Sequence, residues 1–132
     1  KTATKVTSFI AGDAEAEFVG TWYLEDPESG AFNMYVTENK STDSGAELKG
    51  YIWDSIGFGT FEGRIDSKTF MFVKVYEQDA HEKGGLKGGV EYKLRASEDD
   101  PKLYEGVYIG LGGAQKAGAR VEIKKFALAT AQ

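Results

Sequence analysis

Short runs of residues with a period of two recur along almost the whole chain, and they constrain its fold more than any other feature of the sequence. In the first run, Phe18, Gly20 and Trp22 alternate with Val19 and Thr21. Such alternation predicts strands whose two faces meet different environments, and no long stretch has a helical period. The runs occupy residues 18–24, 32–37, 48–53, 58–65, 69–77, 90–95, 104–108 and 120–125.

Turn signals and short polar segments separate these runs, which predicts hairpin connections between neighbouring strands. About eight strands joined in this way favour an all-β fold, a single antiparallel up-and-down β-barrel, over a parallel sheet. An open sandwich of the same strands is the alternative. We expect residues 39–45 to form a polar loop between the second and third strands.

One domain is expected, because 132 residues with 41% hydrophobic content bury one sizeable core. Residues 1–16 are assigned to an N-terminal segment, residues 17–127 to the barrel and residues 128–132 to a short tail. Residues 5–10 of the N-terminal segment are the candidate for an extra strand, in which Phe9 and Ile10 need an apolar surface to pack on.

The charge of the chain limits its partners. It carries 16 Lys and Arg against 21 Asp and Glu, a net charge of -5. Such a surface repels phosphate backbones and anionic headgroups, so we expect no nucleic-acid and no membrane partner. No apolar run approaches the ~20 residues of a spanning helix, and the first residues do not resemble a signal peptide. The absence of cysteine excludes disulfides and thiol chemistry but leaves the compartment unresolved.

The first strand carries a family resemblance. Gly20-Thr21-Trp22-Tyr23 is similar to the opening of the first barrel strand in the calycin group of lipocalins, fatty-acid-binding proteins and avidins, although the later signatures of these families have no counterpart. The resemblance implies a barrel that binds a small ligand. It also implies a basic side chain across the Trp22 ring, for which Lys125, or Arg120 in a shifted register, is the candidate. Because Gly20 lacks a side chain, another segment is expected close to its backbone.

Placing the charged residues outside assigns the other face of each run to the barrel interior. That interior set comprises Phe18, Trp22, Leu24, Phe32, Met34, Val36, Leu48, Ile52, Phe61, Ile65, Phe70, Phe72, Lys74, Tyr76, Val90, Tyr92, Leu94, Tyr104, Tyr108, Val121, Ile123 and Lys125. An interior of this size is either filled by side chains or holds one small ligand. The residues expected to contact such a ligand are Trp22, Phe32, Met34, Phe61, Phe72, Lys74, Tyr76, Tyr92 and Tyr108.

Lys74 is the unusual member of the interior set, because it alternates with Phe72 and Tyr76 on an otherwise aromatic face. A buried ammonium needs an anion, a ring face or water. A ligand carboxylate would supply the anion. The alternatives are an acidic residue on the next strand, or a position near the barrel mouth from which Lys74 reaches solvent.

Catalytic and metal-binding patterns are weak. His81 is the only histidine and lies in a polar loop, so neither a catalytic triad nor a metal site is expected, and no cofactor is implied. We therefore expect non-enzymatic binding of a small, largely apolar ligand, with or without an acidic group. A structural or interaction barrel with a filled core is the alternative. A further alternative is an isomerase, cyclase or lyase that uses Tyr76, Tyr92 or Tyr108 beside Lys74.

The fifth run is apolar on both of its faces. If Phe70, Phe72 and Tyr76 point inward, then Met71, Val73 and Val75 form an apolar row on the outside. An exposed apolar row on an acidic protein indicates a contact surface. Either residues 6–10 pack across it or a second subunit does, and we expect a homo-oligomer with a two-fold axis.

Overall fold

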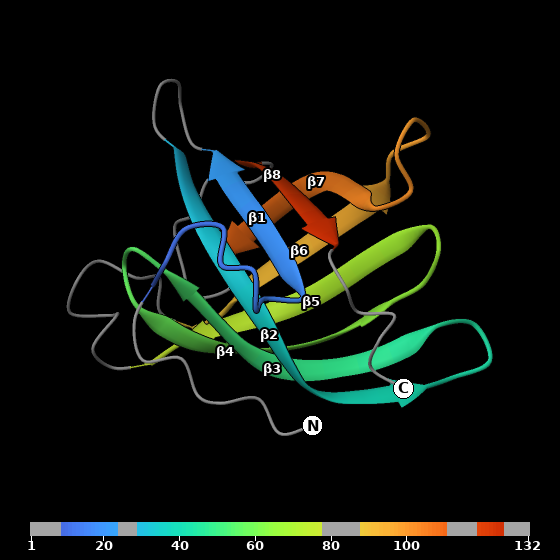
Figure 1. Cartoon of the computed structure of the whole chain (residues 1–132), viewed down its shortest axis with the longest axis horizontal. Helices are drawn as coiled ribbons and strands as arrows, with labels where there is room; N and C mark the ends of the chain where they lie inside the picture. Colours follow the sequence, from blue (N-terminus) through green and yellow to red (C-terminus); the bar gives the residue numbers. More distant parts are fainter. Residues whose placement is uncertain (1–8, 24–28, 78–87, 111–118, 126–132) are drawn as a thin grey trace.

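The polypeptide forms a closed antiparallel β-barrel (Figure 1). The computed structural model describes residues 9–23, 29–77, 88–110 and 119–125, and the description that follows concerns those ranges. The strands are β1 (Phe18–Tyr23), β2 (Ser29–Ser41), β3 (Ala46–Asp54), β4 (Phe58–Ile65), β5 (Thr69–Tyr76), β6 (Val90–Ala96), β7 (Leu103–Gly110) and β8 (Ala119–Lys125).

Each strand pairs with its neighbours in chain order, and β1 pairs with β8 to close the sheet. In that closing pair Phe18 lies opposite Lys125 and Trp22 opposite Val121. The predicted up-and-down barrel is therefore confirmed, and the open sandwich is wrong. The described residues contain no helix, and so none that is long and apolar enough to cross a membrane.

The hydrophobic core lies at the positions that the period of two predicts to face inward. Every member of the buried hydrophobic cluster occupies a position that was assigned to the interior, whereas Leu24 and the side chain of Lys125 lie outside the described residues. The cluster consists of Phe18, Phe32, Met34, Leu48, Ile52, Phe61, Ile65, Phe70, Phe72, Val90, Tyr92, Leu94, Tyr104, Tyr108, Val121 and Ile123.

Two glycines of the first hairpin lie directly beneath aromatic rings. A Cβ atom on Gly20 would lie 2.2 Å from Cζ of Phe32, and one on Gly30 would lie 2.2 Å from Cζ2 of Trp22. In both cases the ring belongs to the neighbouring strand and covers the backbone that the missing side chain exposes. The expected close approach at Gly20 is therefore present.

The second hairpin is longer than the sequence predicts. Residues 39–41 belong to β2, where Asn39 pairs with Leu48 and Ser41 pairs with Ala46. Their side chains are exposed, so the alternation that reveals a half-buried strand is missing from this end of the hairpin. The register shifts between Val36 and Glu38, which marks a β-bulge.

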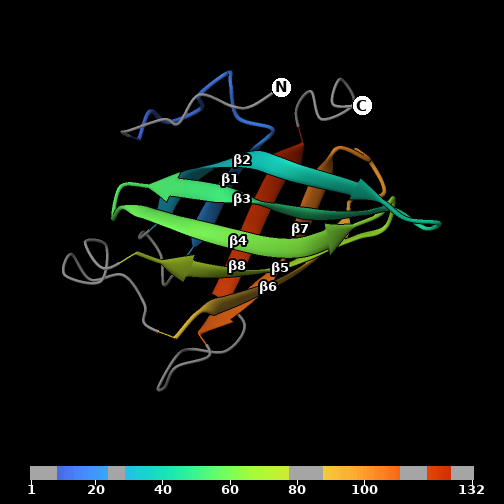
Figure 2. The same cartoon turned by 90° about the horizontal axis from the view of Figure 1, so that it is seen from below.

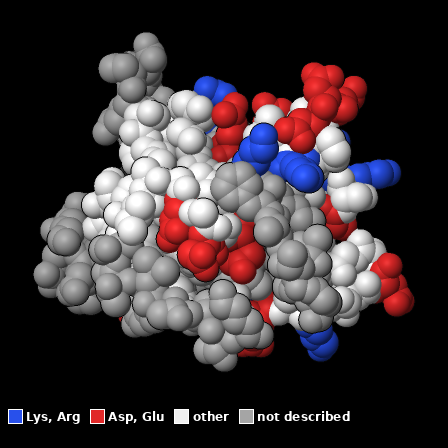
Figure 3. All heavy atoms as spheres, in the orientation of Figure 1, with Lys and Arg blue, Asp and Glu red and all other residues white. Residues whose placement is uncertain are grey.

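The described part of the N-terminal segment packs on the outer face of β2. Asn33 donates a hydrogen bond from Nδ2 to the carbonyl oxygen of Ile10 over 2.7 Å, and Tyr35 donates to Asp13 over 2.6 Å. Phe9 and Ile10 are not in a strand, so that part of the predicted extra strand is wrong, and residues 5–8 lie outside the described ranges. Acidic side chains gather at the centre of the face in Figure 3, where Figure 1 places this segment.

Candidate functional site

Aromatic rings from opposite walls of the barrel contact each other in the interior. Phe18 of β1 and Phe70 of β5 have ring centroids 4.8 Å apart, and Phe32 of β2 and Tyr92 of β6 have centroids 6.2 Å apart. In a barrel of this strand order, β1 faces β5 and β2 faces β6. In Figure 2, β8 runs across the direction of β3, β4 and β5, so strands on opposite walls of the barrel cross one another.

A stack of rings continues along one wall. Phe72 and Tyr92 stack with centroids 4.4 Å apart, and Tyr92 and Tyr108 stack with centroids 5.5 Å apart. Of the residues predicted to contact a ligand, Phe32 and Met34 are 0% exposed and Tyr108, at 8%, is the most exposed of the buried ones. These buried rings therefore pack against one another in the interior.

Trp22 differs from the other predicted ligand-contacting residues because it is only half-buried, although it packs against the core cluster. The other eight, Phe32, Met34, Phe61, Phe72, Lys74, Tyr76, Tyr92 and Tyr108, are all buried. The predicted inward orientation of this set is therefore confirmed for the described residues. Whether any of them contacts a ligand stays a prediction.

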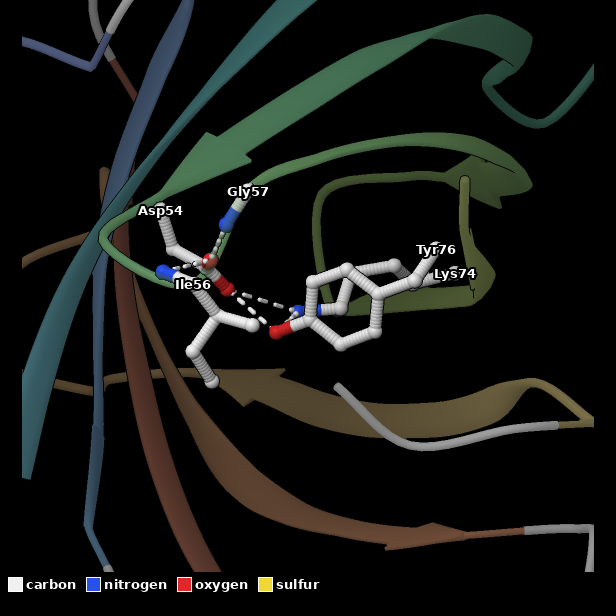
Figure 4. A network of polar contacts seen from close by, with 5 residues as sticks. All are labelled: Asp54, Ile56, Gly57, Lys74 and Tyr76. Carbon is white, nitrogen blue, oxygen red and sulfur yellow. Dashed lines mark hydrogen bonds and ion pairs between the residues drawn. The ribbon is translucent and has the colours of Figure 1, made fainter. Parts of the chain in front are cut away.

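Lys74 forms a buried ion pair with Asp54 (Figure 4). Its Nζ lies 3.2 Å from Oδ2 of Asp54 and 2.9 Å from the hydroxyl oxygen of Tyr76, and Tyr76 donates a hydrogen bond to the same Oδ2. The ammonium also faces the rings of Phe32 and Tyr92, with centroids 5.9 Å and 5.7 Å away. The anion that Lys74 requires is therefore a residue of the chain itself.

The other carboxylate oxygen of Asp54 organises the turn between β3 and β4. Oδ1 accepts hydrogen bonds from the backbone N–H groups of Ile56 and Gly57 over 2.8 Å and 2.9 Å. Gly59, the inward residue of β4 that pairs with Tyr76, has no side chain to separate Tyr76 from Asp54. The cluster thus joins β3 to β5 across β4.

The protonation states in this cluster favour a structural role. Burial opposes the charged form of Lys74, but the oxygens of Tyr92 and Tyr76 and the carboxylate of Asp54 outweigh it, so the pKa of Lys74 is raised. Burial is also the main cause that raises the pKa of Tyr76. Both groups therefore hold their protons at neutral pH, and neither is a general base there.

Sequence reasoning missed Asp54, which it placed in a turn, and it expected any acidic partner of Lys74 on the next strand. Asp54 instead ends β3, two strands away from β5. A signal was present, because Leu48, Gly50 and Ile52 point inward and the period of two makes Asp54 the next inward position.

The basic residue expected over Trp22 is not found at Arg120. The Arg120 guanidinium lies 3.9 Å from the ring centroid of Tyr23 and 2.8 Å from Oε2 of Glu122, on the outside of the barrel. Arg120 is therefore wrong for that role. Lys125 pairs through its backbone with Phe18, and its side chain is outside the described residues.

The outer face of β5 carries the predicted apolar row. We call Met71, Val73 and Val75 the β5 outer row; Met71 is 42% exposed, Val75 is 45% exposed and Val73 is half-buried. The described part of the N-terminal segment contacts β2 and does not cover this row. Beside the row is an open groove of about 440 Å³, lined by Thr37, Lys49, Gly50, Tyr51, Thr60, Phe61, Glu62, Val73 and Val75.

Aromatic side chains continue this surface across β3 and β4. Ring centroids are 5.8 Å apart for Tyr35 and Tyr51, 5.6 Å for Tyr51 and Phe58, and 5.2 Å for Phe58 and Trp53. Among the described residues, no cluster of acidic or histidine side chains is arranged to hold a metal ion, and His81 lies outside the described ranges.

Comparison with known protein families, curated proteins and solved structures finds no match to this chain. The calycin resemblance therefore rests on residues 20–23, and the barrel agrees with what it implies about the fold.

Proposed function

We propose that this protein is a non-enzymatic, self-associating β-barrel that binds protein surfaces rather than a small molecule in its interior. The β5 outer row supports this function most directly. It exposes Met71 and Val75 on a strand whose opposite face, with Phe70 and Phe72, is fully packed in the core. Soluble proteins rarely leave such a continuous apolar row uncovered, so a partner is expected to cover it.

The ring contacts between opposite walls argue against the two other functions that the sequence suggests. A carrier of an apolar ligand needs free volume, whereas Phe18 and Phe70 meet across the barrel. An isomerase, cyclase or lyase needs substrate contact, whereas Lys74 is 1% exposed and already bound to Asp54. Binding of a small, largely apolar ligand as in calycins would therefore require these side chains to move apart.

Closure of the barrel also limits how a partner can bind. Because β1 pairs with β8, the described sheet is closed, although residues 35–41 of β2 have a partner strand only in β3. Along the closed part of the sheet, a partner must pack on side chains of an outer face. The β5 outer row and its groove are the apolar part of that surface.

The molar mass in solution tests this proposal. We expect light scattering to give twice the chain mass for the natural protein at micromolar concentration, and the chain mass for Val73→Lys. A lysine at position 73 lies between Glu62 and Glu91, whose negative charges favour it, so the fold is retained. A partner packed on this strand would remove water from the ammonium group, and this cost opposes association. Ile10→Lys is the matched control, because Ile10 is 59% exposed and lies on the N-terminal segment beside β2, away from β5.

Two kinds of result, one from the molar mass and one from bound small molecules, would contradict the proposal. One is a natural protein with the mass of a single chain, or a Val73→Lys variant that keeps the mass of the natural protein. The other is a native mass spectrum in which a small molecule copurifies with the chain, which would restore interior ligand binding as the better function.

A further inference from the structure

The charges on either side of the β5 outer row are sorted by sign. Val73 pairs with Glu62 of β4 on one side and with Glu91 of β6 on the other. All three belong to the outer face, since their neighbours in each strand point into the core. We call these residues the acidic level.

The neighbouring outward position along β5 lies between two residues of the opposite charge. Met71 pairs with Arg64 of β4 on one side and with Lys93 of β6 on the other, and all three side chains are exposed. We call these residues the basic level. The two levels are adjacent rows of one surface, each with an apolar residue on β5 between two like charges.

We propose that a second copy of this chain packs on this surface about a two-fold axis that lies in the plane of the contact, runs across β5 and passes between the two levels. This inference rests on the proposed self-association and names its geometry. A two-fold axis at that point turns the acidic level of one copy onto the basic level of the other. The β5 strands of the two copies then run antiparallel, so that Glu62 lies opposite the partner subunit's Arg64 and Glu91 lies opposite the partner subunit's Lys93.

The charges determine this register because the nearby alternatives bring like charges together. An axis of this direction at Val73 would place Glu62 opposite the partner subunit's Glu62, and one at Met71 would place Arg64 opposite the partner subunit's Arg64. Like charges across an interface cost several kcal/mol, which disfavours both positions. Only an axis between the levels pairs opposite charges at all four positions, with Met71 and Val73 at its centre.

The shape of the barrel and the existing ion pairs fit this arrangement. Packed sheets lie ~10 Å apart, and two convex barrels approach most closely along one strand, so β5 makes the apolar contact and β4 and β6 supply charged flanks. Within the chain, Lys93 lies 3.8 Å from Glu91, an exposed pair of little energetic value. Neither Glu62 nor Arg64 takes part in an ion pair among the described residues. These charges are therefore available to a partner subunit.

Charge reversal tests the pairing. Glu62→Lys places lysine opposite the partner subunit's Arg64, and Arg64→Glu places glutamate opposite the partner subunit's Glu62, each twice per dimer. We expect either variant to raise the dissociation constant of the dimer at least about tenfold at low salt, as measured by sedimentation. Glu105→Lys is the control: it makes the same charge change on the exposed face of β7 and should leave the constant unchanged.

Recombination of the variants separates pairing from a general loss of stability. An equimolar mixture of Glu62→Lys and Arg64→Glu should form a heterodimer, because both of its cross-pairs are again of opposite sign, and the double variant should again form a homodimer. If the natural protein is a dimer and the single reversals leave it intact, or recombination restores nothing, this geometry is wrong while self-association stands. If the natural protein is a monomer, both are wrong.

Discussion

At the scale of single residues, Lys74 has the most demanding environment in the molecule. Its ammonium is 1% exposed, and it is stabilised by one carboxylate oxygen and one phenol oxygen. A buried ion pair gives little net stability compared with an apolar replacement, because desolvation offsets most of the attraction. Removing one partner is much more costly, since the remaining charge then has no counter-ion.

Lys74→Met is therefore expected to destabilise the barrel by about 3–5 kcal/mol, because Asp54 stays buried without its counter-ion. The double variant Asp54→Asn/Lys74→Met should be more stable than this single variant. Asparagine at position 54 retains an Oδ1 atom that can accept hydrogen bonds from the backbone N–H groups of Ile56 and Gly57. Urea unfolding of the two single variants and the double variant measures the coupling. A Lys74→Met protein with natural stability would show that the pair has no structural role.

At the scale of the strands, small residues allow the barrel walls to bend and approach. The first hairpin is the clearest case, because Phe32 of β2 lies over Gly20 of β1 and Trp22 of β1 lies over Gly30 of β2. Each aromatic ring thereby packs on a backbone in place of a side chain. These two contacts link the Gly-x-Trp motif of the first strand to the packing of the whole hairpin.

Gly20→Ala is expected to destabilise the fold by about 1–3 kcal/mol, the usual cost of adding a methyl group to a packed core. The added Cβ would lie 2.2 Å from the Phe32 ring, which must move away from it. Thermal unfolding measures the loss, and combining Gly20→Ala with Phe32→Leu should cost less than the sum of the two single changes. Strict additivity of the two changes would contradict the contact.

At the scale of the whole molecule, the buried hydroxyl and ammonium groups connect stability to alkaline pH. The pKa values of Lys74 and Tyr76 are raised, so in the folded state both keep their protons to a higher pH than in the unfolded chain. Burial and the hydrogen bond to Asp13 raise the pKa of Tyr35 in the same direction. The stability that these groups contribute is complete below their ordinary pKa values and is lost as pH rises above them.

We therefore expect these three groups to leave the free energy of unfolding unchanged between pH 8 and about pH 10. Above pH 10 they should lower it. Urea titrations at several pH values measure this fall. Tyr76→Phe removes one of the titrating groups, so its stability should decrease less steeply in the alkaline range. An equally steep decrease in Tyr76→Phe would show that Tyr76 titrates in the folded protein as it does in the unfolded chain.

The sequence by itself determined the strands, their inward faces and the outward position of Met71, Val73 and Val75, because alternation with a period of two follows directly from strand geometry. Only the tertiary structure decided that Lys74 pairs with Asp54, since that contact crosses β4 and depends on the shear of the closed barrel. The same holds for the ring contacts across the interior: eight strands leave room for a ligand or for side chains, and contacts such as that between Phe18 and Phe70 exist only once opposite walls face each other.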